Sequence, residues 1–205
     1  IVLGRALFAV VALVIFAQLG SLPLVRQLTR RHLASLVLCG VFLAIHWLTF
    51  FHAIKLSGVG IATLGFASFP AFVVLLEAVF WREHPSRQDL VKVGLVCAGL
   101  LLIPAEFSLQ ADNTEGLLWA ILSGFCFAAV SVGNRLTSGR LHPVQIACWQ
   151  SLVVALIALP TGTLALAQMP ALDWLWIGLL GVFCTGLAQV LFVSSLRVLN
   201  ARTAS

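Results

Sequence analysis

The stretch "LAIHWLTFFHAIKLSGVGIATLGFASFPAFVVLLEAVFWRE" (residues 43–83) contains two long apolar runs joined by a short segment of small and polar residues. Before Arg82, its only Asp, Glu, Lys or Arg residues are Lys55 and Glu77. A bilayer core is about 30 Å thick and needs about 20 helical residues to cross. With the residues that precede it, the stretch predicts two membrane-spanning helices, at 33–54 and 58–80.

The rest of the chain has the same character. Of its 205 residues, 61% are hydrophobic and only 9% are charged, against about 25% charged in soluble domains. The backbone must be hydrogen-bonded within the protein in lipid, and runs of this length do so as helices. We therefore predict an all-α, polytopic transmembrane helix bundle whose partner is the lipid bilayer. Seven spans are predicted: 4–20, 33–54, 58–80, 90–105, 116–136, 144–167 and 173–196.

The basic residues predict the orientation of these spans. Ten of the twelve fall in alternate connections: Arg26, Arg30, Arg31, Arg82, Arg87, Lys92, Arg135, Arg140, Arg197 and Arg202. Lys and Arg concentrate on the cytoplasmic side of membrane proteins, so this side is expected to be cytoplasmic. Their scatter over short loops, without a basic patch or arm, argues against a nucleic-acid partner despite the net charge of +5.

Two segments of the sequence resemble each other. "LCGVFLAIHWLTFF" (38–51) and "LLGVFCTGLAQVLF" (179–192) share Leu, Gly, Val, Phe and a final Phe in the same register. In the predicted topology their spans run in opposite directions, which is the signature of an inverted repeat in secondary transporters. Chance similarity between apolar helices is the alternative. The repeats are predicted at 1–105 and 116–205.

His46 is the main candidate in span 33–54. It shares a helical face with Thr49, and an ionisable group at membrane depth is by default a functional candidate. Its ordinary pKa of about 6.5 suits proton-linked switching. The alternative is a neutral imidazole hydrogen-bonded to a neighbouring helix. His52, on another face near Lys55, is expected at the membrane interface.

Span 58–80 places Thr63, Pro70 and Glu77 on one helical face. Pro70 has no N–H and would free the carbonyl of Phe66, giving either a site-lining bend or a packing kink. Glu77 pairs with a base or faces water in one interpretation, and contacts an ion or substrate in the other.

Span 173–196 places Thr185 and Gln189 near one face. Gln189 is interpreted as an interhelical hydrogen bond or as a cavity contact. Arg5 lies on the outer side against the orientation rule; it either snorkels to the interface or meets a carboxylate or an anionic substrate.

Enzyme motifs are few. The sequence has no HExxH, GxSxG or GxxxxGK[ST], and none of its five cysteines has metal-ligand spacing, so no cofactor and no metal site is predicted. His84 and Asp89 form an HxxxxD, a spacing that some membrane acyltransferases use. A membrane enzyme of that kind and a non-transporting membrane scaffold are kept as alternatives.

The segment from His46 to Glu83, followed by "GLVCAGLLLI", resembles the first repeat of the EamA-like branch of the drug/metabolite transporter superfamily. The shared pattern is an aromatic "HWxxFFxAI", a mid-helix proline at Pro70 and a glutamate at Glu83; Arg5 matches an arginine that often opens the second helix of the family. The resemblance implies ten helices in two inverted five-helix repeats, of which this chain would hold the second to the eighth as a piece of a longer protein.

The resemblance also implies a function. Family members mostly move small metabolites, amino acids or drugs across bacterial inner membranes. The expectation is therefore an exporter of a small organic molecule working by alternating access, with a coupling proton and a homodimer as further candidate partners. The predicted substrate pathway comprises His46, Thr49, Phe50, Thr63, Pro70, Glu77, Thr185, Gln189 and Arg5.

The orientation can be tested with single cysteines in a cysteine-free background. Arg30→Cys should react only from the cytoplasmic side and Asp112→Cys only from the outside, because an odd number of predicted spans separates them. An impermeant thiol reagent applied to intact cells checks this, and labelling of both positions would refute the orientation.

Overall fold

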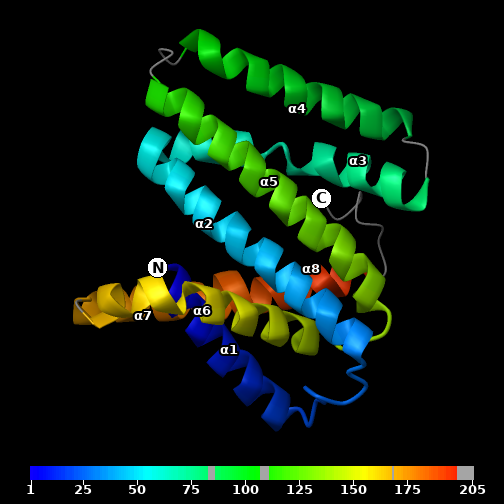
Figure 1. Cartoon of the computed structure of the whole chain (residues 1–205), viewed down its shortest axis with the longest axis vertical. Coiled ribbons are helices and arrows are strands. Elements are labelled where there is room, and N and C mark those ends of the chain that lie inside the picture. Colours follow the sequence, from blue (N-terminus) through cyan, green and yellow to red (C-terminus); the bar gives the residue numbers. More distant parts are fainter. Residues whose placement is uncertain (83–85, 107–110, 168, 198–205) are drawn as a thin grey trace. The chain divides into compact units, whose positions relative to one another are not determined.

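A computed structural model describes residues 1–82, 86–106, 111–167 and 169–197 (Figure 1). Over these ranges the chain forms helices and no strand. The elements are α1 (Val2–Leu19), α2 (Arg30–Phe66), α3 (Phe69–Trp81), α4 (Arg87–Glu106), α5 (Ala111–Ser138), α6 (Pro143–Ala167), α7 (Ala171–Gly181), the π-helix η1 (Val182–Leu187) and α8 (Ala188–Ser195).

Five segments are long and apolar enough to cross a membrane: Val2–Leu19, Arg30–Phe66, Asn113–Ser138, Pro143–Pro160 and Ala171–Ser195. The prediction of an all-α polytopic bundle is confirmed. The predicted span 90–105 lies in α4, which is not among these five, and α3 is a shorter apolar helix.

The chain divides into two compact units. Unit 1 comprises Ile1–Ala44 and Gly133–Asn200, and unit 2 comprises Ile45–Val132, so that α2 and α5 contribute to both. The predicted division into repeats at 1–105 and 116–205 is a different one and stays a prediction.

In unit 1, α1 packs against α6, α7 and η1 (Figure 1). One core cluster joins α1 to α6 through Leu13, Ala17, Val144, Ala147 and Cys148. Three alanines of α1, Ala6, Ala9 and Ala17, are at most 1% exposed. Small side chains let membrane helices approach closely, which explains why α1 forms the densest contacts of this unit.

In unit 2, the core between α2 and α5 is built from Ala53, Ala62 and Ala120, with Phe50 and Trp119 packed around them. Many large apolar side chains in both units are exposed in the isolated chain, as expected for helices that face lipid.

The predicted span 58–80 differs from the structure. Instead of one bent helix, α2 continues from the preceding span to Phe66, with a non-helical residue at Gly58, and α3 begins at Phe69. Pro70 therefore lies in the first turn of α3, where a proline is tolerated because its missing N–H would have no partner in the helix. The predicted kink at Pro70 is in fact a break at residues 67–68.

The predicted span 173–196 is also not one regular helix. It changes from α to π geometry at Val182 and returns to α geometry at Ala188. A π segment holds more residues per turn than an α-helix, so the predicted alignment of Thr185 and Gln189 at α-helical spacing is not continuous across it.

Gly58 has φ +78° and ψ 170°, and a Cβ there would meet nothing within 4 Å. Gly60, in regular helix two residues on, has equally open surroundings. Gly58→Ala should therefore lower the free energy of unfolding by about 1–3 kcal/mol through backbone strain alone. Gly60→Ala, the matched control, should raise it by about 0.5–1 kcal/mol. Unfolding in detergent measures both, and equal effects would show that the break at Gly58 is absent.

Candidate functional site

The predicted pathway residues fall in both units. Arg5, Thr185 and Gln189 belong to unit 1, and the remaining six belong to unit 2. The two groups are described separately.

In unit 1 the structure brings Arg5 and Thr185 together. Nε of Arg5 on α1 donates a hydrogen bond of 2.9 Å to Oγ1 of Thr185 in η1. Thr185 is 2% exposed, and its hydroxyl donates in turn to the carbonyl of Leu180, five residues earlier. Hydrogen bonds from a charged donor are stronger than neutral ones, so this contact fixes the guanidinium beside the π-helix.

Close packing of α7 against α1 brings Arg5 and Thr185 within hydrogen-bonding distance. A Cβ at Gly181 would lie 2.6 Å from Cβ of Phe8 and 2.7 Å from the carbonyl oxygen of Arg5. Only a glycine lets α7 approach α1 so closely at this level. The helix that carries Arg5 and the segment that carries Thr185 are thereby held at hydrogen-bonding distance.

Gln189 takes part in a chain of amides between α5, α6 and α8. Its Nε2 donates to Oε1 of Gln150 at 2.8 Å, and Nε2 of Gln150 donates to Oδ1 of Asn134 at 2.6 Å. Ser151 donates to Oε1 of Gln189 at 3.4 Å. Gln150 and Asn134 are completely buried, and Nδ2 of Asn134 has no hydrogen-bond partner. Both interpretations of Gln189 stay open, because an interhelical hydrogen bond and an unused buried donor occur in the same network.

In unit 2, His46 on α2 packs against α5. Its Nδ1 lies 2.7 Å from Oγ of Ser123, which donates back to the carbonyl of His46 at 3.1 Å. The imidazole is 7% exposed and is surrounded by aromatic rings, with ring centroids 5.1 Å from Phe66 and 5.0 Å from Phe127. A hydrogen bond to a neighbouring helix was the alternative interpretation of this residue; a role in transport stays a prediction.

The neighbours of His46 contribute in different ways. The ring of Phe50 lies 6.1 Å from that of His46 and is partly buried. The hydroxyl of Thr49 donates to the carbonyls of Ile45 and His46, within its own helix. Thr63 is exposed and donates to Val59. The hydroxyls of Thr49 and Thr63 thus donate their hydrogen bonds to backbone carbonyls of their own helix.

Glu77 of α3 is completely buried, so its carboxylate does not face bulk water here. Pro70 lies in the first turn after the break. Helix α5 approaches the break at Gly124: a Cβ on that glycine would lie 2.8 Å from Oγ of Ser68 and 3.2 Å from the carbonyl oxygen of Phe66. The broken backbone is therefore covered by protein rather than by lipid.

His52 is exposed on α2, and its ring meets Trp119 edge-on at 5.2 Å. Separate roles for the two histidines stay a prediction. Of the HxxxxD pair, His84 lies outside the described residues. Asp89 accepts from the backbone N–H of Ser86 at 2.9 Å, while its own N–H donates to Oγ of Ser86 at 3.2 Å. This is a capping box at the start of α4, a structural role for Asp89.

The polar partners Ser123, Asn134 and Gln150 were missed by the sequence interpretation. Each is completely buried in an apolar span, and that location is the signal that could have identified them. Among the residues that the structure describes, no group of three His, Cys, Asp or Glu side chains is placed to hold a metal ion.

Helices of membrane-spanning length, buried polar side chains on several of them and interrupted spans define the class as a polytopic helical membrane protein. The model of the EamA-like transporter family matches residues 1–104 and 114–205. The chain belongs to this family.

Several curated relatives carry transporter names. An uncharacterized transporter of Bacillus subtilis, YxxF, is 26% identical over 178 residues, which cover 85% of this chain and 57% of that protein. The pseudopaline exporter CntI of Pseudomonas aeruginosa is 29% identical over 133 residues, 65% of this chain and 46% of the exporter. The chain thus spans about half the length of these relatives. No solved structure matches it significantly.

The Arg5–Thr185 contact predicts a stability difference between two variants. Thr185→Val keeps the side-chain shape but removes the hydroxyl, and should lower the free energy of unfolding by about 1.5–3 kcal/mol, the usual range for a hydrogen bond to a charged group. Thr185→Ser keeps the acceptor and should cost less. Unfolding of the purified protein measures both, and equal losses would mean that the hydroxyl contributes nothing.

Proposed function

We propose that the whole protein is a secondary transporter that exports a small organic metabolite by alternating access. The observation that carries the proposal is the Arg5–Thr185 hydrogen bond at a π-helix inside a membrane span. Interrupted helices with polar side chains are how secondary transporters form substrate sites in the bilayer, and π segments often mark functional sites.

Family membership supports membrane transport in general, and the name of the pseudopaline exporter supports the outward direction. The site would contact a small polar molecule, with Arg5 interacting with its negative groups and Gln189 with its hydrogen-bonding groups. The proposal includes two inverted repeats and a bacterial inner membrane as the location, with the arginine-rich loops in the cytoplasm.

Proton coupling is the proposed role of the pathway residues in unit 2. His46 and Glu77 are both buried ionisable residues of unit 2. The Ser123 hydroxyl donates its proton to the carbonyl of His46, so Nδ1 of the neutral ring already donates to Ser123 and the lone pair of the ring is on Nε2. Protonation would add a donor and a positive charge at Nε2, on a ring that Phe66 and Phe127 surround, and would so affect the packing of α2 on α5.

Counterflow into proteoliposomes that contain the whole protein tests the proposal. Uptake of a labelled amino acid or metabolite, driven by the same unlabelled compound inside, would support a transporter. Product formation without translocation would indicate an enzyme, and neither result across a broad panel of metabolites would indicate a scaffold; both outcomes overturn the proposal.

Proton coupling predicts a specific pattern among the histidine variants. His46→Gln should reduce transport about tenfold, the effect of about 1.4 kcal/mol on a barrier. It should also flatten the pH dependence of transport between pH 5.5 and 8, because glutamine does not titrate there. His52→Ala, the control on the exposed face, should retain transport. Normal pH-dependent transport by His46→Gln would exclude protonation of His46 from the mechanism.

A further inference from the structure

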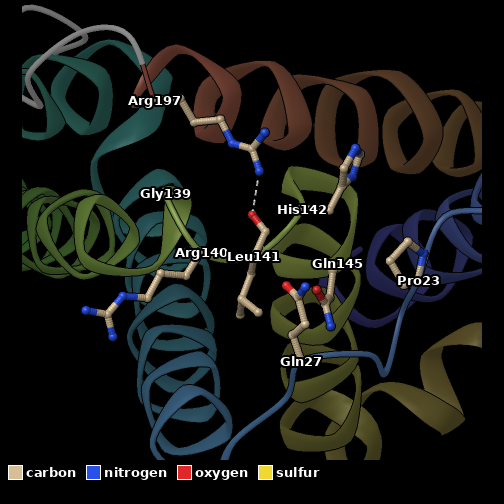
Figure 2. Close-up of a pocket in the computed structure, with 8 residues that line it drawn as sticks. All are labelled: Pro23, Gln27, Gly139, Arg140, Leu141, His142, Gln145 and Arg197. Atoms are coloured by element: carbon tan, nitrogen blue, oxygen red, sulfur yellow. Dashed lines mark hydrogen bonds between the residues drawn. The ribbon is translucent and has the colours of Figure 1, made fainter.

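Unit 1 contains a pocket of about 480 Å³ at the turn between α5 and α6 (Figure 2), and the described residues that line it include none of the predicted pathway residues. Its size is within the ordinary range of ligand pockets, about 300–1,000 Å³. Its lining comes from the α1–α2 loop, the α5–α6 turn, the first turn of α6 and the segment that follows α8. The residues are Pro23, Gln27, Gly139, Arg140, Leu141, His142, Gln145 and Arg197.

The charge of the pocket is positive, and none of the described residues that line it carries a carboxylate. The sequence of unit 1 holds seven arginines but a single acidic residue, Asp173, at the start of α7. The pocket is placed among the loops that carry most of these arginines. A ligand that complements this lining is an anion.

Arg197 is held in place by neutral groups. Its Nε donates to the carbonyl of Ser138 at 2.8 Å and its Nη2 to the carbonyl of Leu141 at 2.6 Å (Figure 2). These bonds use two of the five N–H groups of the guanidinium, and neither acceptor carries a charge. The side chain is therefore ordered in advance, while its positive charge remains to attract an anion.

His142 supplies a second donor. The backbone N–H of Val144 donates to its Nδ1 at 3.3 Å, so the proton of the neutral ring is on Nε2. Burial, and to a smaller extent the charge of Arg197, lower the pKa of His142 below its ordinary value. The ring is then a neutral donor at pH 7 rather than a second cation competing with Arg197.

The opposite wall is fixed by α6. Nε2 of Gln145 donates to the carbonyls of Leu24 and Arg26, and the indole N–H of Trp149 donates to the same Leu24 carbonyl. These bonds pin the α1–α2 loop, in which Gln27 has φ +66°. A pre-organised wall reduces the ordering cost of binding.

We propose that this pocket binds the phosphate group of an anionic phospholipid, with Arg197 as the principal cation and Nε2 of His142 as a second donor. A guanidinium suits phosphate because its planar N–H groups pair with two oxygens at once. The lining residues lie at span ends and connections on the side predicted to be cytoplasmic, where anionic lipids concentrate and basic pockets between helices bind their headgroups. Inorganic phosphate offers the same chemistry without a membrane anchor.

Titration of the detergent-solubilised whole protein with phosphatidylglycerol, phosphatidylcholine or inorganic phosphate, followed by native mass spectrometry, tests the proposal. Phosphatidylglycerol should bind in preference to phosphatidylcholine, and Arg197→Gln should weaken it about tenfold or more. Arg31→Gln removes an exposed arginine from the same predicted side outside the pocket and should leave the affinity unchanged. Equal weakening by both variants would reveal unspecific surface charge. Saturation by inorganic phosphate without competition from the lipid would overturn the lipid assignment.

A second measurement needs no variant and covers the case in which Arg197→Gln fails to fold. A phosphate beside His142 favours the imidazolium, so the pKa of His142, followed by NMR, should rise in phosphatidylglycerol nanodiscs relative to phosphatidylcholine nanodiscs. Unchanged titration of His142 would contradict the proposal.

Discussion

Every backbone N–H and C=O that lies in a bilayer core must find its hydrogen-bond partner inside the protein, and two of the spans here are interrupted. At the first interruption, Ser68 donates to the carbonyl of Gly65, and Gly124 lets α5 cover the exposed backbone. At the second, Thr185 donates to the carbonyl of Leu180. In both places a hydroxyl side chain binds a backbone carbonyl, and a glycine (Gly124 or Gly181) lets a neighbouring helix pack closely. The need to satisfy the backbone in lipid therefore limits which residues can occupy an interruption of a span.

The same constraint connects the breaks to the candidate site. A hydroxyl that satisfies a backbone carbonyl also has lone pairs to offer, and Thr185 uses one to accept from Arg5. The hydroxyl of Thr185 therefore does two things: it satisfies a backbone carbonyl of the π-helical segment and it holds Arg5 of α1 in place. In unit 2, Ser123 combines the two tasks differently, contacting both the ring and the backbone carbonyl of His46.

The lengths of the apolar runs were sufficient to predict an all-α membrane bundle, since burial in lipid depends on composition over about twenty residues. The positions of the breaks were not predicted. Pro70 indicated an irregularity, but whether a proline bends a helix or starts a new one depends on what packs against it, here Gly124 from a distant segment. The π-helix adds a residue to a turn without changing the apolar pattern. Likewise, His46 was identifiable from its place in the span, whereas its partner Ser123 is 77 residues away.

The similar segments 38–51 and 179–192 share a glycine, Gly40 or Gly181, and both glycines have the same packing role. A Cβ at Gly40 would lie 2.6 Å from Cβ of Val153 on α6, and a Cβ at Gly181 equally close to Phe8 on α1. Both positions lie within unit 1, and at each of them a side chain would clash with the neighbouring helix. Apolar letters recur by chance among membrane helices, but a glycine at a crossing point is required by the distance between the axes. The similarity between 38–51 and 179–192 therefore includes a packing function, which is the kind of resemblance that repeated architecture would preserve.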